Sequence, residues 1–210
     1  MKCIEKNMKA YVTIFDKHSS LIDLFERYGF YYYGKKDSVS GVESVYIKNA
    51  NKIFNDMYLD YPKIHIRDNN KFLLSIYPKF HTRMFPDSKL RTEKDLFIED
   101  VSSSNSIEKI YLSGAYHLDR FKKGDIAVIY RTSDNGPAWY ESVATSVCVV
   151  EEIKHISQFS SYKEFLDYCI KYSVFEEKEL RKFWKSKKYP FLIKMLYNIA
   201  LKKGQSENNL

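Results

Sequence analysis

"FKKGDIAVIYRT", residues Phe121 to Thr132, decides what kind of fold this chain of 210 residues adopts. The stretch opens with a Lys-Lys-Gly-Asp turn, in which Gly124 is free to take a positive φ angle. Four apolar residues follow, Ile126 to Ile129, and a short apolar run after a turn is typical of a buried strand. The stretch therefore predicts a core β-strand that ends at Tyr130, Arg131 and Thr132.

The segments around this strand continue the β pattern. Four more strands are predicted from their alternating or β-branched residues: "KFLLSIY" (71–77), "IEKIYLSG" (107–114), "ESVATSVCVVEEI" (141–153) and "PFLIKMLY" (190–197). Two amphipathic helices interrupt them, "SSYKEFLDYCIKY" (160–172) and "SVFEEKELRKFW" (173–184), with Ser161 and Ser173 as the expected N-caps. The pattern predicts an α+β chain in which residues 71–201 form a small β-barrel with inserted helices.

This layout resembles the PUA-like superfamily, which includes the EVE, ASCH and YTH domains. The resemblance is carried by "GDIAVIYR" (124–131), "SVATSVCVVEEI" (142–153) and "PFLIKML" (190–196). "SIYPKFHTRMFPD" (75–87) and "SVFEEKEL" (173–180) look like parts of bacterial proteins that fuse a PUA-like domain to an acetyltransferase domain. The resemblance implies binding of RNA or of a modified base. The Gly-x-Lys signature of ASCH domains is not visible, so amidohydrolase activity is not expected.

The first fifty residues predict a strand, a helix and a β-hairpin. "KAYVTIF" (9–15) reads as a strand, and the stripe Leu21, Leu24, Phe25, Tyr28 indicates a helix that ends at Gly29. "FYYYGKK" and "VESVYIK" read as two strands around the turn "DSVSG". This β-α-β-β unit resembles the C-terminal part of the GNAT acetyltransferase fold.

Two departures from the GNAT pattern bear on activity. The family holds the pyrophosphate of acetyl-CoA on a Gly-rich loop at a helix start, where backbone N–H groups meet the anion. That loop would lie upstream of residue 9, and no similar loop is found elsewhere in the sequence. A Tyr that protonates the leaving thiolate is often found four residues before the Gly, and here that position is Phe25. We therefore expect no catalytic residue and no bound cofactor in this chain alone.

The domain boundaries follow from composition. Residues 1–50 are assigned to the GNAT-like portion, and the polar, Asn-rich segment 51–70 to a linker. Residues 71–201 are assigned to the domain that resembles PUA-like proteins, and residues 202–210 are read as a flexible polar tail.

The first group of candidate binding residues lies in "YPKFHTRMFPDSKLR" (77–91), where two prolines predict a rigid loop. Lys79 and Arg83 are suited to contact phosphate, and Tyr77 and His81 to stack on a base or hydrogen-bond to it. The alternative is a solvated connection between strands.

The second group flanks the predicted hairpin after the core strand. Tyr130 and Arg131 end one strand, and "GPAWYES" (136–142) precedes the next. Trp139 and Tyr140 are candidates for the walls of an aromatic cage around a base, with Arg131 contacting phosphate. The alternative is that Trp139 fills the end of the barrel.

Composition narrows the class of partner. The formal net charge of +7 and the pI of about 9.0 favour an anionic partner, although a Lys-rich proteome explains them equally well. Three scattered cysteines and five histidines without HxH or HxxxH spacing predict neither disulfides nor a metal site. No signal peptide and no membrane-length apolar run is seen, so a soluble cytoplasmic protein is expected.

Three functions stay open on this evidence. The first is a nucleic-acid or nucleotide binder, possibly specific for a modified base. The second is a fragment or subunit of an acetyl-CoA-dependent N-acetyltransferase, completed by a protein partner. The third is a protein-interaction module, such as one component of a toxin–antitoxin pair.

Overall fold

The computed structural model describes residues 9–88, 106–115, 117–133 and 142–201. The chain is an α+β protein that divides into two compact units, Met1–His65 and Ile66–Leu210. The division falls inside the segment 51–70 that was predicted as a linker. The predicted tail, residues 202–210, lies outside the described residues.

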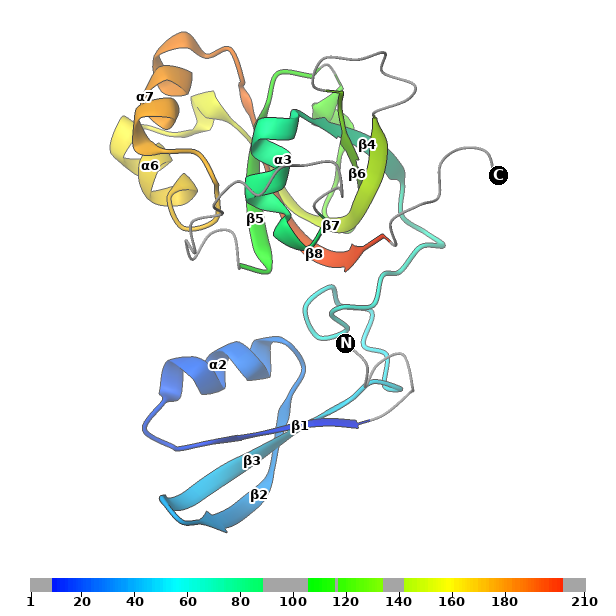
Figure 1. Ribbon diagram of the computed structural model, residues 1–210, viewed down its shortest axis with the longest axis vertical. Coiled ribbons are helices and arrows are strands. Elements are labelled where there is room, and N and C mark those ends of the chain that lie inside the picture. Colours follow the sequence, from blue (N-terminus) through cyan, green and yellow to red (C-terminus); the bar gives the residue numbers. More distant parts are fainter. Residues whose placement is uncertain (1–8, 89–105, 116, 134–141, 202–210) are drawn as a thin grey trace. The chain divides into compact units, whose positions relative to one another are not determined.

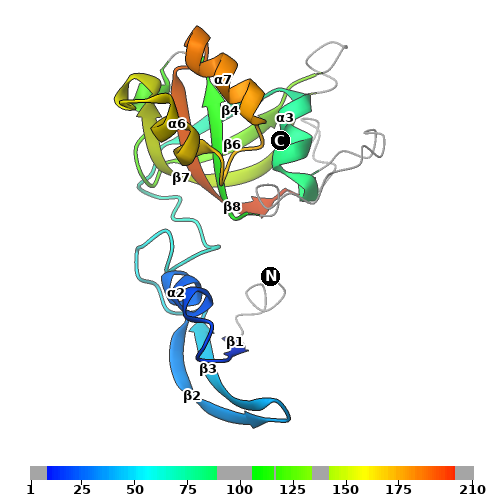
Figure 2. The ribbon, with the colours of Figure 1, turned by 90° about the vertical axis from the view of Figure 1, so that its left-hand side faces the viewer.

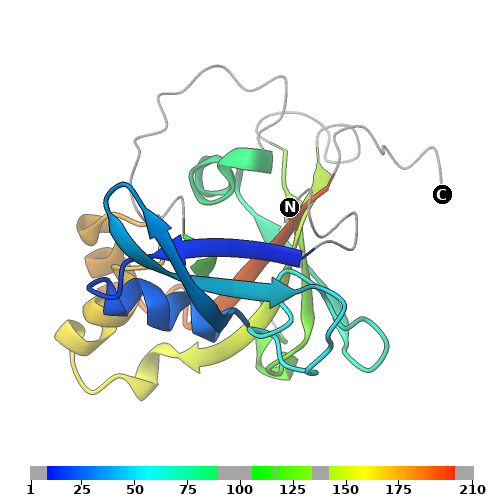
Figure 3. The ribbon, with the colours of Figure 1, turned by 90° about the horizontal axis from the view of Figure 1, so that it is seen from below.

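The first unit contains the predicted strand, helix and hairpin. β1 (Lys9–Ile14), α2 (Ser19–Arg27), β2 (Tyr31–Ser38) and β3 (Gly41–Asn49) follow in that order. The strands form an antiparallel sheet in the order β1-β3-β2, and α2 covers one of its faces (Figure 1, Figure 3). Gly29 ends the helix with φ +82°, as predicted.

Residues after β3 complete the small core of the first unit around a buried carboxylate. Asp60 is 3% exposed and accepts hydrogen bonds from the backbone of Phe54 and Asp56 and from His65 Nε2 at 2.8 Å. Lys48, also buried, donates to the carbonyl oxygens of Tyr28 and Leu59. These bonds fix the segment 54–65 to the helix and to β3.

The second unit contains the five predicted strands. They are β4 (Lys71–Ile76), β5 (Glu108–Ser113), β6 (Ile126–Arg131), β7 (Val143–His155) and β8 (Phe191–Ala200). Their order is β4-β6-β7-β8-β5, with β4 and β6 parallel and the other neighbours antiparallel. Within the described residues the edge strands β4 and β5 do not pair with each other, so the sheet does not close into the predicted barrel.

Helices cover this sheet from two sides. α6 (Tyr162–Cys169) and α7 (Glu177–Ser186) lie together on one flank (Figure 2), where the rings of Phe165 and Trp184 are 5.3 Å apart. Ser161 caps α6 as predicted, by accepting from the Glu164 amide. Ser173 does not cap α7, because Val174 and Phe175 are buried in the core and the helix starts only after Glu176.

The segment 77–91 was predicted as a rigid loop, and in its described part this is wrong. Residues Pro78–Met84 form the helix α3, and Pro86–Ser88 form the short 3-10 helix η1. Pro78 occupies the first helical turn, where its missing N–H costs no hydrogen bond and its fixed φ suits a helix. The prolines therefore flank a helix instead of stiffening a loop.

The core of the second unit lies between the sheet and the helices. It is built from fully buried residues of every strand, of α3 and of α6 and α7. The largest are Phe85, Phe165, Ile76, Met84, Ile110, Ile129, Leu180, Leu192, Ile193 and Met195. Two short 3-10 helices, η2 (Leu118–Arg120) and η3 (Ile156–Gln158), complete the unit.

Candidate binding site at the ends of the parallel strands

The parallel pairing of β4 and β6 brings two predicted binding segments together. Ile76 and Arg131 are partners at the carboxyl ends of these strands, and the Thr132 amide donates to the Ile76 carbonyl at 3.0 Å. Tyr77 follows Ile76 directly and begins α3. The segments around 77–83 and around 130–131 therefore lie side by side, although about fifty positions separate them in sequence.

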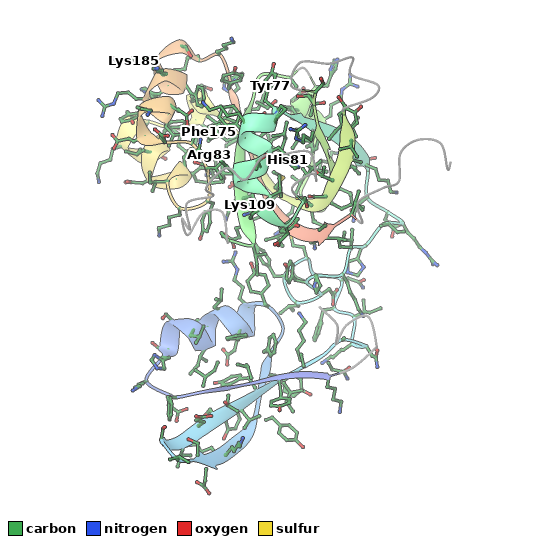
Figure 4. The ribbon with its side chains drawn as sticks, viewed as in Figure 1. Tyr77, His81, Arg83, Lys109, Phe175 and Lys185 are labelled. Atoms are coloured by element: carbon green, nitrogen blue, oxygen red, sulfur yellow. The ribbon has the colours of Figure 1, made fainter. Side chains whose placement is uncertain are left out.

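His81 points from α3 toward the sheet (Figure 4) and is fully buried. Its Nε2 is 2.7 Å from Thr145 Oγ1 on β7, and the Thr145 hydroxyl donates to the Ile129 carbonyl at 3.4 Å. Because that hydroxyl has only one hydrogen, His81 Nε2 must be the donor to it. Nδ1 is then a buried acceptor, and no described residue gives it a partner.

Arg131 makes this buried site electropositive. The residue is 4% exposed, and one guanidinium nitrogen donates to the Thr132 carbonyl at 3.3 Å. Burial of the imidazole, and then the charge of Arg131, lower the pKa of His81 to about 4. His81 is therefore neutral at physiological pH, and Arg131 supplies the positive charge. The neighbouring Tyr130 is half-buried.

Tyr77 offers an aromatic ring to the solvent beside this site. Its side chain is 59% exposed, whereas Tyr111 on β5 is buried and hydrogen-bonded to the backbone of Tyr77. Burial raises the pKa of Tyr111, so its hydroxyl stays protonated. The Tyr77 backbone is thus held in place while its ring remains available for stacking.

Lys79 and Arg83 share one carboxylate, which the sequence did not identify as their partner. Lys79 Nζ is 3.1 Å and an Arg83 guanidinium nitrogen 3.5 Å from the carboxylate oxygens of Glu179 on α7. Glu179 also accepts from the Glu176 amide, which caps α7. The two cations therefore tie α3 to α7, and the group retains a net charge of +1. Their contact with phosphate stays a prediction.

Trp139 and Tyr140, the predicted cage walls, lie outside the described residues. The antiparallel pairing of β6 with β7 confirms the hairpin that carries them. Among the described residues, no group of three or more His, Cys, Asp or Glu side chains is arranged to hold a metal ion. In the same part of the chain, no helix is long and apolar enough to cross a membrane.

A second cluster of polar residues, which the sequence did not suggest, is buried against the strands of the second unit. Lys109 on β5 is 1% exposed, and burial lowers its pKa to about 8 against the opposing influence of Cys148 and Asp87. Nearby, Ser88 shares hydrogen bonds with Ser146 at 2.8 Å and with Tyr197 at 3.3 Å. All six residues of β5, Lys109 among them, are buried.

A cavity of about 290 Å³ is lined by residues of β4 and of the segment 115–121. The rings of Phe72 and Phe121, stacked with centroids 4.1 Å apart, form part of its wall, and His117 lines it with the left-handed φ of 70°. Its walls are otherwise apolar apart from Ser75 and Arg120. None of the predicted binding residues lines this cavity.

No family model, no curated protein and no solved structure matches this chain.

Proposed function

We propose that the second unit binds nucleic acid or a nucleotide where β4 and β6 end, in the manner of a PUA-like domain. One observation carries this proposal: the exposed ring of Tyr77 stands at the strand ends that also hold the buried charge of Arg131. A stacking ring suits any base, and a guanidinium suits phosphate or a base acceptor. The net charge of +7 adds long-range attraction for a polyanion.

The neutral His81 supports recognition of a base as well as of charge. The cluster beside the strand ends contains an acceptor, His81 Nδ1, and a donor group, the Arg131 guanidinium, so both senses of hydrogen bond are represented there. Such a combination can distinguish base edges, which bare phosphate contacts cannot do. The modified base expected from the PUA-like resemblance is part of this proposal.

The test is fluorescence anisotropy with labelled 12-mer single strands and duplexes of RNA and DNA, and competition by mononucleotides. Tyr77→Phe keeps the ring and should bind like the unchanged chain. Tyr77→Ala should weaken binding by about 1–3 kcal/mol, as expected for one stacked base. If the unchanged chain binds none of these probes at low salt, the proposal is wrong.

A second candidate function, protein interaction, is favoured by the first unit. Tyr11, Ile47 and Tyr31 are register partners across β1, β3 and β2, so their side chains share the sheet face opposite Tyr46, which is buried. Tyr11 is 75% and Tyr31 47% exposed. A subunit that completes a GNAT-like fold would cover such a face. Tyr11→Ser with Tyr31→Ser should then abolish the complex in co-purification with that subunit.

A further inference from the structure

The second half of α7 and the turn after it carry four lysines that have no acidic partner among the described residues, which we call the α7 lysine patch. Its members are Lys182, Lys185, Lys187 and Lys188. All four are exposed, and none pairs with a carboxylate in the described part of the chain. The first half of the helix differs, because Lys178 pairs with Glu176 and Arg181 with Glu177. Positive charge therefore accumulates at one end of α7.

The backbone under this patch is held firmly. Lys187 adopts the left-handed φ of 52°, and its ammonium lies 3.2 Å from the centre of the Trp184 ring. The Lys188 carbonyl packs so closely on Gly114 that a Cβ there would come within 2.7 Å of it. Lys182 and Lys185 project outward, because Leu180 and Phe183 occupy the opposite, inward face. The patch is thus a positioned array of charges.

Contacts in the core link the α7 lysine patch with the segment that carries the ring of Tyr77. Tyr189 directly follows Lys188 and interacts with Tyr111, which is itself hydrogen-bonded to the backbone of Tyr77. The Lys79 and Arg83 pairs with Glu179 hold α3 against the start of α7. Figure 4 draws Tyr77 and Lys185 toward the same end of the second unit. The ring of Tyr77 and Lys185 of the patch thus lie toward one end of the unit, as binding of one strand to both requires.

We infer that the α7 lysine patch binds the phosphate backbone of single-stranded nucleic acid whose base stacks on Tyr77. This inference rests on the proposed function and specifies its substrate class. Stacking on an exposed ring needs an unpaired base, which favours a single strand over a duplex. From Lys182 to the end of α7 at Ser186 the chain rises about 6 Å at roughly 1.5 Å per residue, and Lys187 and Lys188 extend the patch beyond the helix.

An anionic membrane surface is the competing partner for such a patch. Membrane-bound helices place apolar side chains beside their lysines and insert them between lipids. In α7 the neighbouring rings are already used for packing: Phe183 contacts Phe175 and Tyr189, and Trp184 contacts Phe165. The patch therefore has charge without an apolar face to insert, which favours a nucleic-acid backbone.

The experiment compares two double variants of the full chain. Lys182→Ala with Lys185→Ala removes two patch charges, and Lys122→Ala with Lys123→Ala removes two exposed charges from the turn before β6. The probes are fluorescein-labelled 12-mers of oligouridylate and oligodeoxythymidylate, a 12-base-pair duplex, and vesicles of phosphatidylcholine with phosphatidylserine. Binding is measured at several salt concentrations, and thermal melting checks that each variant is folded.

For the patch variant we expect binding of the single strands to weaken roughly 25-fold at 0.1 M salt. The magnitude of the log–log salt slope should fall by about 1.4, which is about 0.7 for each lost phosphate contact. The Lys122/Lys123 variant should stay within about threefold of the unchanged chain. If both variants bind single strands equally well, the inference is wrong while the proposed function stands.

Other outcomes separate the two proposals further. Tighter binding of the duplex than of the single strands would overturn the single-strand assignment. Binding to vesicles without binding to any oligonucleotide would identify the patch as a membrane contact and would overturn both proposals. Binding to neither probe would remove the proposed function itself.

Discussion

Acidification should destabilise the second unit through one residue, His81. Its pKa is about 4 in the folded chain and about 6.5 in an unfolded one. Between these values the unfolded state binds more protons than the folded state, so stability rises with pH and is lost as pH falls from 6.5 to 4. The difference of about 2.5 pKa units, at 1.36 kcal/mol each, corresponds to about 3 kcal/mol. That is a large share of the 5–15 kcal/mol typical of a folded domain.

The assay is urea unfolding at pH values from 7.5 to 4.5, followed by tryptophan fluorescence. Both tryptophans, Trp139 and Trp184, belong to the second unit, so the signal reports on that unit alone. His81→Gln should flatten the dependence on pH. His117→Asn is the matched control, because His117 is exposed and Asn tolerates its left-handed φ. Equal pH dependence in the unchanged chain and in His81→Gln would refute the reasoning.

Three further predictions concern other buried or paired residues. The pKa of Lys109 is lowered to about 8, so from pH 8 to 10.5 the unfolded state binds more protons than the folded state. The free energy of unfolding of the unchanged chain should therefore rise by up to about 3 kcal/mol over this range, whereas that of Lys109→Met should not. Urea unfolding between pH 7.5 and 9.5 checks this. Gly29→Ala should destabilise the first unit by more than the usual ~1 kcal/mol, because the new Cβ would lie 2.4 Å from the Leu59 carbonyl oxygen. Gly34→Ala is the control, because its Cβ would have no neighbour within 4 Å. Hydrogen exchange of residues 9–65 distinguishes the two variants. Glu179→Gln should cost at most about 1 kcal/mol in a thermal melt, and if the cations it releases contact phosphate, it should also tighten oligonucleotide binding and steepen its salt dependence.

Much of the fold could be predicted because the strand pattern is local. Runs of apolar and β-branched residues such as Ile126–Arg131 can be recognised within a few consecutive positions of the sequence, and each predicted strand is present. The α3 helix was missed because two prolines were read as loop signals. The same residues fit a helix when one of them stands at its first position. A proline in the sequence does not by itself indicate whether a helix ends before it or begins at it.

Single residues of the candidate site could be predicted from the sequence, but not their proximity in the fold. Tyr77 and Arg131 were identified from residue type, but their meeting depends on the parallel pairing of β4 with β6, which local patterns do not encode. The Lys79–Glu179 pair joins residues 100 positions apart, so no spacing rule could find it. The burial of Lys109 could not be read from the sequence, because an alternating strand usually leaves one face exposed to solvent, while β5 is buried on both faces.

The strand order also has a consequence for synthesis of the chain. β8 lies between β7 and β5, and β5 has no other partner among the described strands. During translation, residues 108–113 must therefore wait until residues 191–200 have left the ribosome before they can pair. Until then β5 is an unsatisfied edge made of Ile110, Tyr111 and Leu112, a segment prone to pair with other chains. The second unit should thus become resistant to protease only once residues 191–200 have left the ribosome, and a nascent chain arrested before Phe191 should bind a chaperone that recognises apolar strands.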